Sequence, residues 1–327
     1  MIDKIKKTVA FVVPTGVGAS IGGFAGDASV FARKFAREMN LIVNPNVVNA
    51  ACFSGITENM LYVEGWALSR FFKGELNLKL ACDNKIGVVF DCAIPQSVLN
   101  VHINTINAVK TVYGVDVVGY ELTKEACGVE FFMTESGVSS GELRRTQTLL
   151  DASKKLIEKG ANAIAVVTLF DDPDESDGYS QGEAVDIVGG IEAVISHYLS
   201  SELMLPVAHA PAFCENEISE EIVDARASAE YITSTFLPCV LLGLQNAPQF
   251  SLNNYDNCIS VKDLSALVMP YNSLGSSIVF DAIKNNVNVC AVKENLTVLG
   301  IDKKALNLQN GVIEFKDYSE CLEYLKN

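Results

Sequence analysis

The sequence predicts an α/β fold with largely parallel, Rossmann-like sheets, helices on both faces and two lobes. Short apolar segments are followed by glycine- and serine-rich turns and then by segments of helical periodicity, and this alternation recurs from end to end. With 327 residues, 49% of them hydrophobic, the chain can bury a large core. We expect an N-terminal lobe over residues 1–150 and a C-terminal lobe over residues 151–327. The pattern leaves open that the two lobes are intertwined.

The predicted elements follow this alternation in order. The first strand is 8–13, and a glycine-rich loop leads from it to a helix on which Ala28, Phe31, Phe35 and Met39 share one face. Residues 171–190 contain almost no apolar side chains, so we expect an exposed loop there. Further strands are expected at 41–43, 87–90, 116–120, 129–133, 163–168, 206–209, 266–269 and 288–292, and further helices from the 135–141 loop to 156, at 191–200, from Ser219 onward, and at 276–284.

Composition excludes some classes of partner and compartment. The formal net charge of −15 and the pI near 4.7 predict repulsion from nucleic acids and from anionic membrane surfaces. The nine cysteines are scattered, without a CxxC motif, as in a reduced cytoplasmic chain. We see neither a signal segment nor an apolar run of membrane-spanning length, and therefore expect a cytoplasmic protein. Apolar helix faces leave a homo-oligomer open.

The segment from Pro14 to Asp27 places five glycines between a buried strand and a helix. Glycine lets backbone N–H groups converge on an anion, and a helix N-terminus favours negative charge. It is not a standard nucleotide motif, because a GxGxxG pattern begun at Gly16 would have Ile21 in place of its third glycine. The alternative is a packed loop with a capping aspartate. The candidate ligand-binding residues are Thr15, Gly16, Gly18, Ser20, Gly22, Gly23 and Asp27.

Two later loops have a related composition. The 135–145 loop offers hydroxyls and an arginine for a phosphate or carboxylate, although Ser139 and Glu142 could instead form a capping box. The 272–277 loop resembles the Gly-Ser-Ser element with which nucleotide-sugar glycosyltransferases and epimerases hold a pyrophosphate. The candidates here are Ser139, Ser140, Arg144, Gly275, Ser276 and Ser277, with Glu294 after the next strand.

Histidines supply the candidate acid/base groups. His209 ends a predicted strand, where α/β proteins gather catalytic side chains, and we predict that it is a general acid or base together with Glu192 and His197. Glu192 and His197 lie about 140° apart on their helix, so each must find its partner elsewhere. The alternative is that these are hydrogen-bonded core histidines. We expect no protein-held metal cluster, although the acidic 171–186 loop could bind Mg²⁺ beside a substrate.

Several segments together resemble a known family. They are Val12–Asp27, Asn44–Ala51, Tyr62–Trp66, Val188–His197 and Ala208–Pro211. This pattern is similar to that of an uncharacterised domain-of-unknown-function family found in cyanobacteria, plastids and other bacteria, and it spans nearly the whole chain. The resemblance implies one architecture and no known reaction.

A fainter likeness concerns residues 155–167. They resemble the helix and strand that precede a catalytic cysteine in aspartate/glutamate racemases, with Thr168 in place of the cysteine turn. That difference speaks against the racemase mechanism.

We therefore expect an enzyme that acts on a small anionic metabolite, phosphorylated, nucleotide-linked or carboxylate, in a cleft between the lobes. Acid/base chemistry of the transferase or isomerase type fits the candidate residues. One alternative is an NAD(P)-dependent oxidoreductase, which is disfavoured because residues 44–46 contain no acidic residue to hold a ribose. The other is a non-catalytic protein that binds a metabolite or senses it for regulation.

Overall fold

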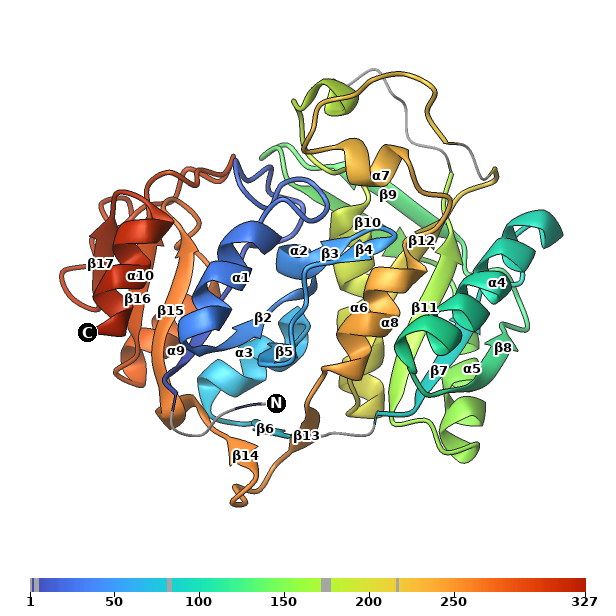
Figure 1. The fold of residues 1–327 in the computed structure, drawn as a ribbon, viewed down its shortest axis with the longest axis horizontal. Helices are drawn as coiled ribbons and strands as arrows, with labels where there is room; N and C mark the ends of the chain where they lie inside the picture. Colours follow the sequence, from blue (N-terminus) through green and yellow to red (C-terminus); the bar gives the residue numbers. More distant parts are fainter. Residues whose placement is uncertain (1, 3–5, 81–83, 172–177, 216–217) are drawn as a thin grey trace.

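A six-stranded parallel sheet combines strands from the first and the last parts of the chain (Figure 1). The computed structural model describes residues 2, 6–80, 84–171, 178–215 and 218–327. The strand order β5-β2-β1-β15-β16-β17 is that of a doubly wound sheet, and it reverses between β1 and β15. The strands are β1 (Thr8–Phe11), β2 (Asn40–Val43), β5 (Met60–Tyr62), β15 (Leu264–Pro270), β16 (Asn288–Val292) and β17 (Val312–Phe315).

A second parallel sheet of four strands is built from the middle of the chain. Its order is β8-β7-β11-β12, with a reversal between β7 and β11. Three of these strands, β7, β11 and β12, are almost wholly buried because helices cover both faces, whereas the edge strand β8 is partly exposed. The strands are β7 (Ile86–Phe90), β8 (Val117–Leu122), β11 (Ala163–Leu169) and β12 (Val207–Ala212).

Helices cover both faces of each sheet, as the continuous burial of the central strands requires. On the six-stranded sheet, α1 (Ser29–Glu38) and α10 (Tyr318–Lys326) cover one face, and α3 (Gly65–Lys73) and α9 (Ser277–Lys284) cover the other. On the four-stranded sheet, α4 (Gln96–Tyr113) and α8 (Leu237–Gln245) face α5 (Thr146–Glu158) and α6 (Gly189–Leu203) across the strands. The predicted fold class, two parallel sheets with helices on both faces, is confirmed.

The four-stranded lobe is inserted between the third and fourth strands of the six-stranded one. The chain therefore crosses between the lobes twice, and both crossings pair in a small antiparallel sheet of β13 (Gln249–Ser251), β6 (Asn77–Lys79) and β14 (Cys258–Ile259). Residue 150, the expected boundary, lies inside α5, in the middle of the inserted lobe. One apolar core, with side chains of Phe11, Phe90 and Leu241, runs through both lobes.

Two local predictions were wrong. The helix expected from the 135–141 loop begins only at Thr146, because Ser139 and Glu142, the alternative capping box, lie in β10 (Ser139–Leu143), which pairs with β9 (Val129–Met133) in an antiparallel hairpin. No helix begins at Ser219, whose hydroxyl accepts a hydrogen bond from the Glu221 amide; the next helix is α7 (Ser228–Tyr231). The remaining elements are α2 (Pro45–Val48), β3 (Asn49–Ala50), β4 (Phe53–Ser54), η2 (Tyr179–Gln181) and η3 (Val261–Asp263). Among the described residues, we find no helix that could span a membrane.

Candidate functional site

A cleft of about 1120 Å³ lies where the carboxyl ends of the two sheets face each other. Its lining includes Thr15 after β1, Asn44 after β2 and Ser276 after β15 from the first lobe, and Phe213 after β12 from the second. The carboxyl ends of parallel strands, at the point where strand order reverses, are where open α/β sheets bind ligands. The cleft thus occupies the position expected of a binding site.

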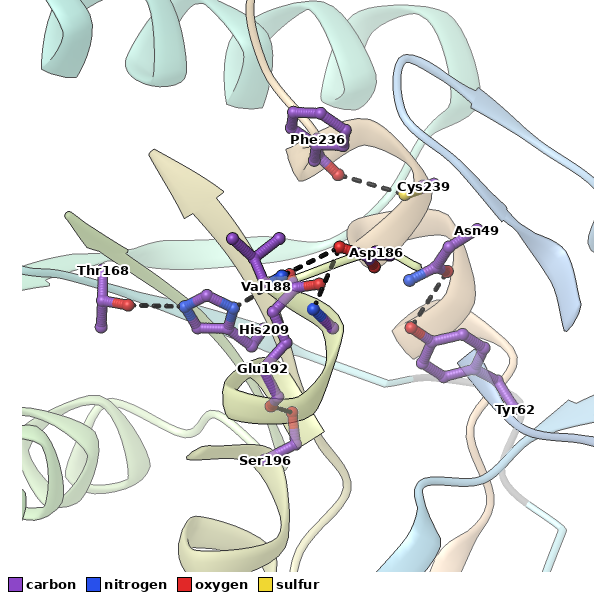
Figure 2. Close-up of polar contacts among 11 residues, drawn as sticks. Asn49, Tyr62, Thr168, Asp186, Val188, Glu192, Ser196, His209, Phe236 and Cys239 are labelled. Atoms are coloured by element: carbon purple, nitrogen blue, oxygen red, sulfur yellow. Dashed lines mark hydrogen bonds and ion pairs between the residues drawn. The ribbon is translucent and has the colours of Figure 1, made fainter. Parts of the chain in front are cut away.

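His209 lies in a chain of side-chain hydrogen bonds deep in this cleft. Its Nε2 is 2.7 Å from Oγ1 of Thr168 on the neighbouring strand β11, and its Nδ1 is 3.1 Å from Oε1 of Glu192 on α6 (Figure 2). The imidazole is fully buried and stacks on Phe170, whereas 24% of the Glu192 side chain is exposed. Glu192 is therefore the end of this hydrogen-bonded chain that a ligand can reach.

The pair holds one proton near neutral pH. Burial raises the pKa of Glu192 to about 8 and lowers the pKa of His209 to about 3, because each charged form is poorly solvated there. A protonated carboxyl next to a neutral imidazole has the same number of protons as a carboxylate next to an imidazolium, so the two groups titrate as a unit. An acid or base with a pKa close to the working pH is suited to proton transfer.

A second histidine and carboxylate meet at the other wall of the cleft. Glu64 caps α3 by accepting hydrogen bonds from the backbone N–H groups of Trp66 and Ala67, both at 2.7 Å, and its carboxyl lies 3.6 Å from Nε2 of His197. Burial raises the pKa of Glu64 to about 7 and lowers that of His197 to about 4. His197 and Glu192, both on α6, thus find separate partners, as the helical geometry requires.

Two further carboxyl groups complete the acidic lining. Asp186 accepts hydrogen bonds from the amides of Val188 and Gly189, at 3.0 and 3.1 Å, where α6 begins. Glu230 accepts from the Ala25 amide at 2.7 Å and from the Tyr179 hydroxyl at 2.8 Å. Burial is the main cause that raises the pKa of Asp186 to about 7 and that of Glu230 to about 8, and repulsion from the other carboxylates adds to it.

The described part of the lining contains no lysine or arginine. The sequence explains this lack, because the stretch between Lys159 and Lys262 has sixteen acidic residues and only one cationic residue, Arg226. Arg226 is occupied by Asp224 and by the carbonyl of Gly182. The described lining therefore has carboxyl groups without a lysine or arginine to neutralise them.

Several backbone amides of the glycine-rich loop donate hydrogen bonds to side chains of the protein itself. The amide of Ile21 donates to Asn295, and that of Gly22 donates to Asp27, whose pKa burial raises to about 6. Asp27 therefore holds the loop, and no side chain caps α1. A Cβ atom on Gly23 would lie 2.2 Å from the Ala19 carbonyl oxygen, so the loop needs this glycine for packing. Of the predicted ligand residues, Thr15 and Gly23 line the cleft, Gly16, Gly18 and Gly22 line a small adjoining void, and Ser20 and Asp27 line neither.

The other predicted ligand residues are mostly outside the cleft. Ser139 joins the glycine loop to α6, because its amide donates to the Gly16 carbonyl and its hydroxyl accepts from the Gly190 amide at 3.0 Å. Ser276 lines the cleft. Ser140 lies on β10, Arg144 forms an exposed ion pair with Glu130, Gly275 and Ser277 flank Ser276 without lining the cleft, and Glu294 accepts from the Tyr318 amide at the start of α10.

Sequence reasoning missed Glu64 and Glu230 as site residues and considered Asp186 only as part of a metal-binding loop. The long stretch with one cationic residue was a signal that could have found Asp186 and Glu230, whereas Glu64 lies outside it. Residues 172–177 of the proposed Mg²⁺ loop lie outside the described residues. Within the described residues, no three His, Cys, Asp or Glu side chains are grouped closely enough to hold a metal ion.

These raised pKa values predict that the protein loses stability as pH rises. In the unfolded chain the pKa is 4.5 for the glutamates and 3.8 for Asp186, so above these values folded Glu64, Asp186, Glu192 and Glu230 bind protons that the unfolded chain has lost. The lowered pKa values of His197 and His209 act in the opposite direction only below their unfolded value of 6.5. We expect the free energy of unfolding in urea to be at least about 1 kcal/mol lower at pH 8.5 than at pH 6.5. In Glu230→Gln the decrease should be smaller, and a rise with pH in the wild type would contradict the assignment.

The sequence and the structure were compared with known protein families, proteins and solved structures. Residues 8–326 match the family described as "Protein of unknown function (DUF3326)". The chain belongs to this family. An uncharacterized lipoprotein of Synechococcus sp. (strain ATCC 27144 / PCC 6301 / SAUG 1402/1) is 34% identical over 324 residues, which cover 97% of this chain and 89% of that protein. Comparison with solved structures finds no match. The resemblance to an uncharacterised family with cyanobacterial members is confirmed.

Proposed function

We propose that this DUF3326 protein is an enzyme that transfers protons to and from a small molecule bound between its lobes, with Glu192 as the acid/base group and His209 behind it. The observation that carries the proposal is the hydrogen-bonded chain from Thr168 through His209 to Glu192, which ends in the cleft. Isomerase or transferase chemistry requires such a reversible proton donor and acceptor.

The geometry assigns a separate role to each member of the chain. If the Thr168 hydroxyl donates to Nε2 of His209, then Nδ1 carries the hydrogen and donates to Oε1 of Glu192. The other carboxyl oxygen of Glu192 is then free to give its proton to the substrate. The carboxylate that remains is stabilised by the Nδ1–H donor and can take a proton back, which completes the cycle. Glu192 is the catalytic residue, and His209 and Thr168 are positioning residues.

The other expectations receive different support. An anionic substrate stays a prediction, and the absence of lysine and arginine from the described lining does not favour it. An NAD(P)-dependent oxidoreductase is less favoured, because amides of the glycine-rich loop are taken up by Asn295, Asp27 and Glu230. The alternative that the protein binds a metabolite without catalysis is tested by the deuterium experiment described below.

We also propose that the protein works in a reducing compartment, as a cytoplasmic protein does. All eight described cysteines are free. The word lipoprotein in the name of the Synechococcus relative applies to that protein, and fractionation of cells that express this chain tests its own location.

Deuterium incorporation tests the enzymatic proposal even though no substrate has been identified. The protein is incubated in D₂O with fractions of a small-molecule cell extract, and mass spectrometry detects compounds that gain one mass unit. We expect at least one compound to be labelled by the wild type and not by Glu192→Gln. If no fraction is labelled while a compound is retained by the protein on ultrafiltration, the protein is a binder without acid/base catalysis.

The two histidines should differ in importance. His209 is fully buried between Thr168 and Glu192, whereas 43% of the His197 side chain is exposed and its nearest carboxylate oxygen is 3.6 Å away. We expect His209→Gln to lower the rate of deuterium incorporation by about 100-fold or more and His197→Gln to lower it by less than about tenfold. Equal losses in the two variants would show that the chain through His209 has no special role.

A further inference from the structure

We propose that the ligand of the inter-lobe cleft carries a protonated amine. The inference deepens the proposed function, since it names the substrate class of the same site. It rests on the size of the cleft, on which charges line it, and on the aromatic rings in its walls.

The charges in the wall point to a cation. Glu64, Asp186, Glu192 and Glu230 all line the cleft, and their partners in the described residues are N–H groups, a tyrosine hydroxyl and histidines, without a lysine or arginine. Residues 172–177 and 216–217, outside the described part of the chain, contain no lysine or arginine in their sequence either. A phosphate or carboxylate brought among these groups would meet no lysine or arginine in the described lining and would be repelled by each carboxyl group that ionises, whereas an ammonium group would be attracted by the ionised forms.

The aromatic side chains of the wall suit the same ligand. Phe24 of the six-stranded lobe packs with Tyr179 of the inserted lobe, with ring centroids 4.7 Å apart, and Phe213 and Phe236, both of the inserted lobe, have centroids 6.5 Å apart. The faces of such rings attract cations. The protein already uses this property once, because the guanidinium of Arg226 lies 4.8 Å from the centre of the Phe24 ring.

An organic cation fits better than a metal ion. No three potential ligands among the described residues are grouped as a metal site requires, so the carboxyl groups are spread around the cavity instead of converging on one point. A cavity of about 1120 Å³ has room for a molecule of many atoms, which can place an amine against one carboxylate and its reacting group at Glu192. Protons should leave the cleft when the amine binds, because a nearby positive charge favours the ionised carboxylates.

Two sets of small molecules that differ in charge test the proposal by isothermal titration calorimetry on the full chain. One set is 1,4-diaminobutane, butane-1,4-diol and succinate; the other is glucosamine, glucose and glucose 6-phosphate. We expect an amine to bind at least about tenfold more tightly than the matched neutral compound and the anion not to bind measurably. In two buffers of different ionisation enthalpy, the observed heats should differ in the direction of proton release.

Glu230→Gln and Glu142→Gln provide the matched variants. A glutamine at 230 can still accept the Ala25 hydrogen bond but removes the charge, so amine binding should weaken at least about tenfold, whereas the exposed Glu142 should not matter. If Glu230→Gln does not fold, the release of protons from the wild type on amine binding, measured by calorimetry in the two buffers, tests the proposal instead. Tighter binding of an anion or an alcohol, or no binding of either amine at millimolar concentration, overturns the proposal. Deuterium labelling of an anionic compound would overturn the amine proposal and leave the enzymatic proposal standing. Amine binding without any deuterium labelling would support the amine proposal and overturn the enzymatic one.

Discussion

Glu192→Gln is expected to lower the rate of catalysed deuterium exchange by two to four orders of magnitude, the range that a positioned general acid or base contributes. The substitution preserves the size of the side chain and the oxygen that can accept from His209, at 3.1 Å in the wild type. The substitution removes the carboxyl proton of Glu192, which is the proton of the Thr168–His209–Glu192 hydrogen-bonded chain that a ligand can reach. The rate is measured by mass spectrometry on the compound that the wild type labels, under saturating substrate, so that weaker binding does not imitate slower chemistry.

The control for this variant is Glu142→Gln, which changes an exposed glutamate on β10 away from the cleft. Its exchange rate should equal that of the wild type. Circular dichroism and urea unfolding should show both variants folded. A Glu192→Gln protein that retains more than about a tenth of the wild-type rate would mean that another group moves the proton.

Gly190→Ala should be the most destabilising of the conservative glycine substitutions near the site. A Cβ atom at position 190 would lie 2.1 Å from the backbone carbonyl oxygen of Ser139, and backbone atoms of the β9–β10 hairpin cannot rotate away as a side chain can. We expect a loss of about 3 kcal/mol in the free energy of unfolding, measured in urea, because either α6 or the hairpin must shift. The same shift displaces Glu192, two residues further along α6, so catalysed exchange should also fall.

The matched control is Gly275→Ala. There the atoms nearest the added Cβ all belong to the Ile301 side chain, the closest being Cδ1 at 3.0 Å, and the end of a flexible side chain can move. The loss of stability should be below about 1 kcal/mol. If Gly190→Ala is no less stable than Gly275→Ala, the hairpin and α6 are not packed as closely as the structure has them.

The fold could be predicted because its signals are local. Strands such as 163–168 and 288–292 are short apolar segments bounded by turns, and they were placed within a residue or two. The long helix α4 was not predicted, because its polar and apolar residues alternate without a clear stripe. The sequence pattern left open that the lobes are intertwined but could not show where one is inserted into the other, since strand pairing over about 200 residues leaves no local signal; β5 and β15 flank the inserted part.

The site was only partly predictable for the same reason. His209 and Glu192 were chosen because one ends a strand and the other lies at a helix border, and the structure joins them by a hydrogen bond. Thr168 was noticed only as a replacement for a cysteine, yet it holds the other side of the imidazole. The glycine loop was interpreted as an anion cradle because composition does not show where the amides point; Asn295, which takes the Ile21 amide, lies more than 270 residues away.

Nuclear magnetic resonance of protein labelled with ¹⁵N-histidine tests the central claim most directly, since the chain has only three histidines to assign. With neutral His209 bound to Glu192, whose pKa is about 8, the His209 nitrogens should show no protonation near pH 6.5, and their shifts should change near pH 8 as Glu192 ionises. The change near pH 8 should be absent from Glu192→Gln, which has no carboxyl group to ionise there. A His209 imidazole that simply gains a proton near pH 6.5, with no change near pH 8, would contradict the acid/base pair.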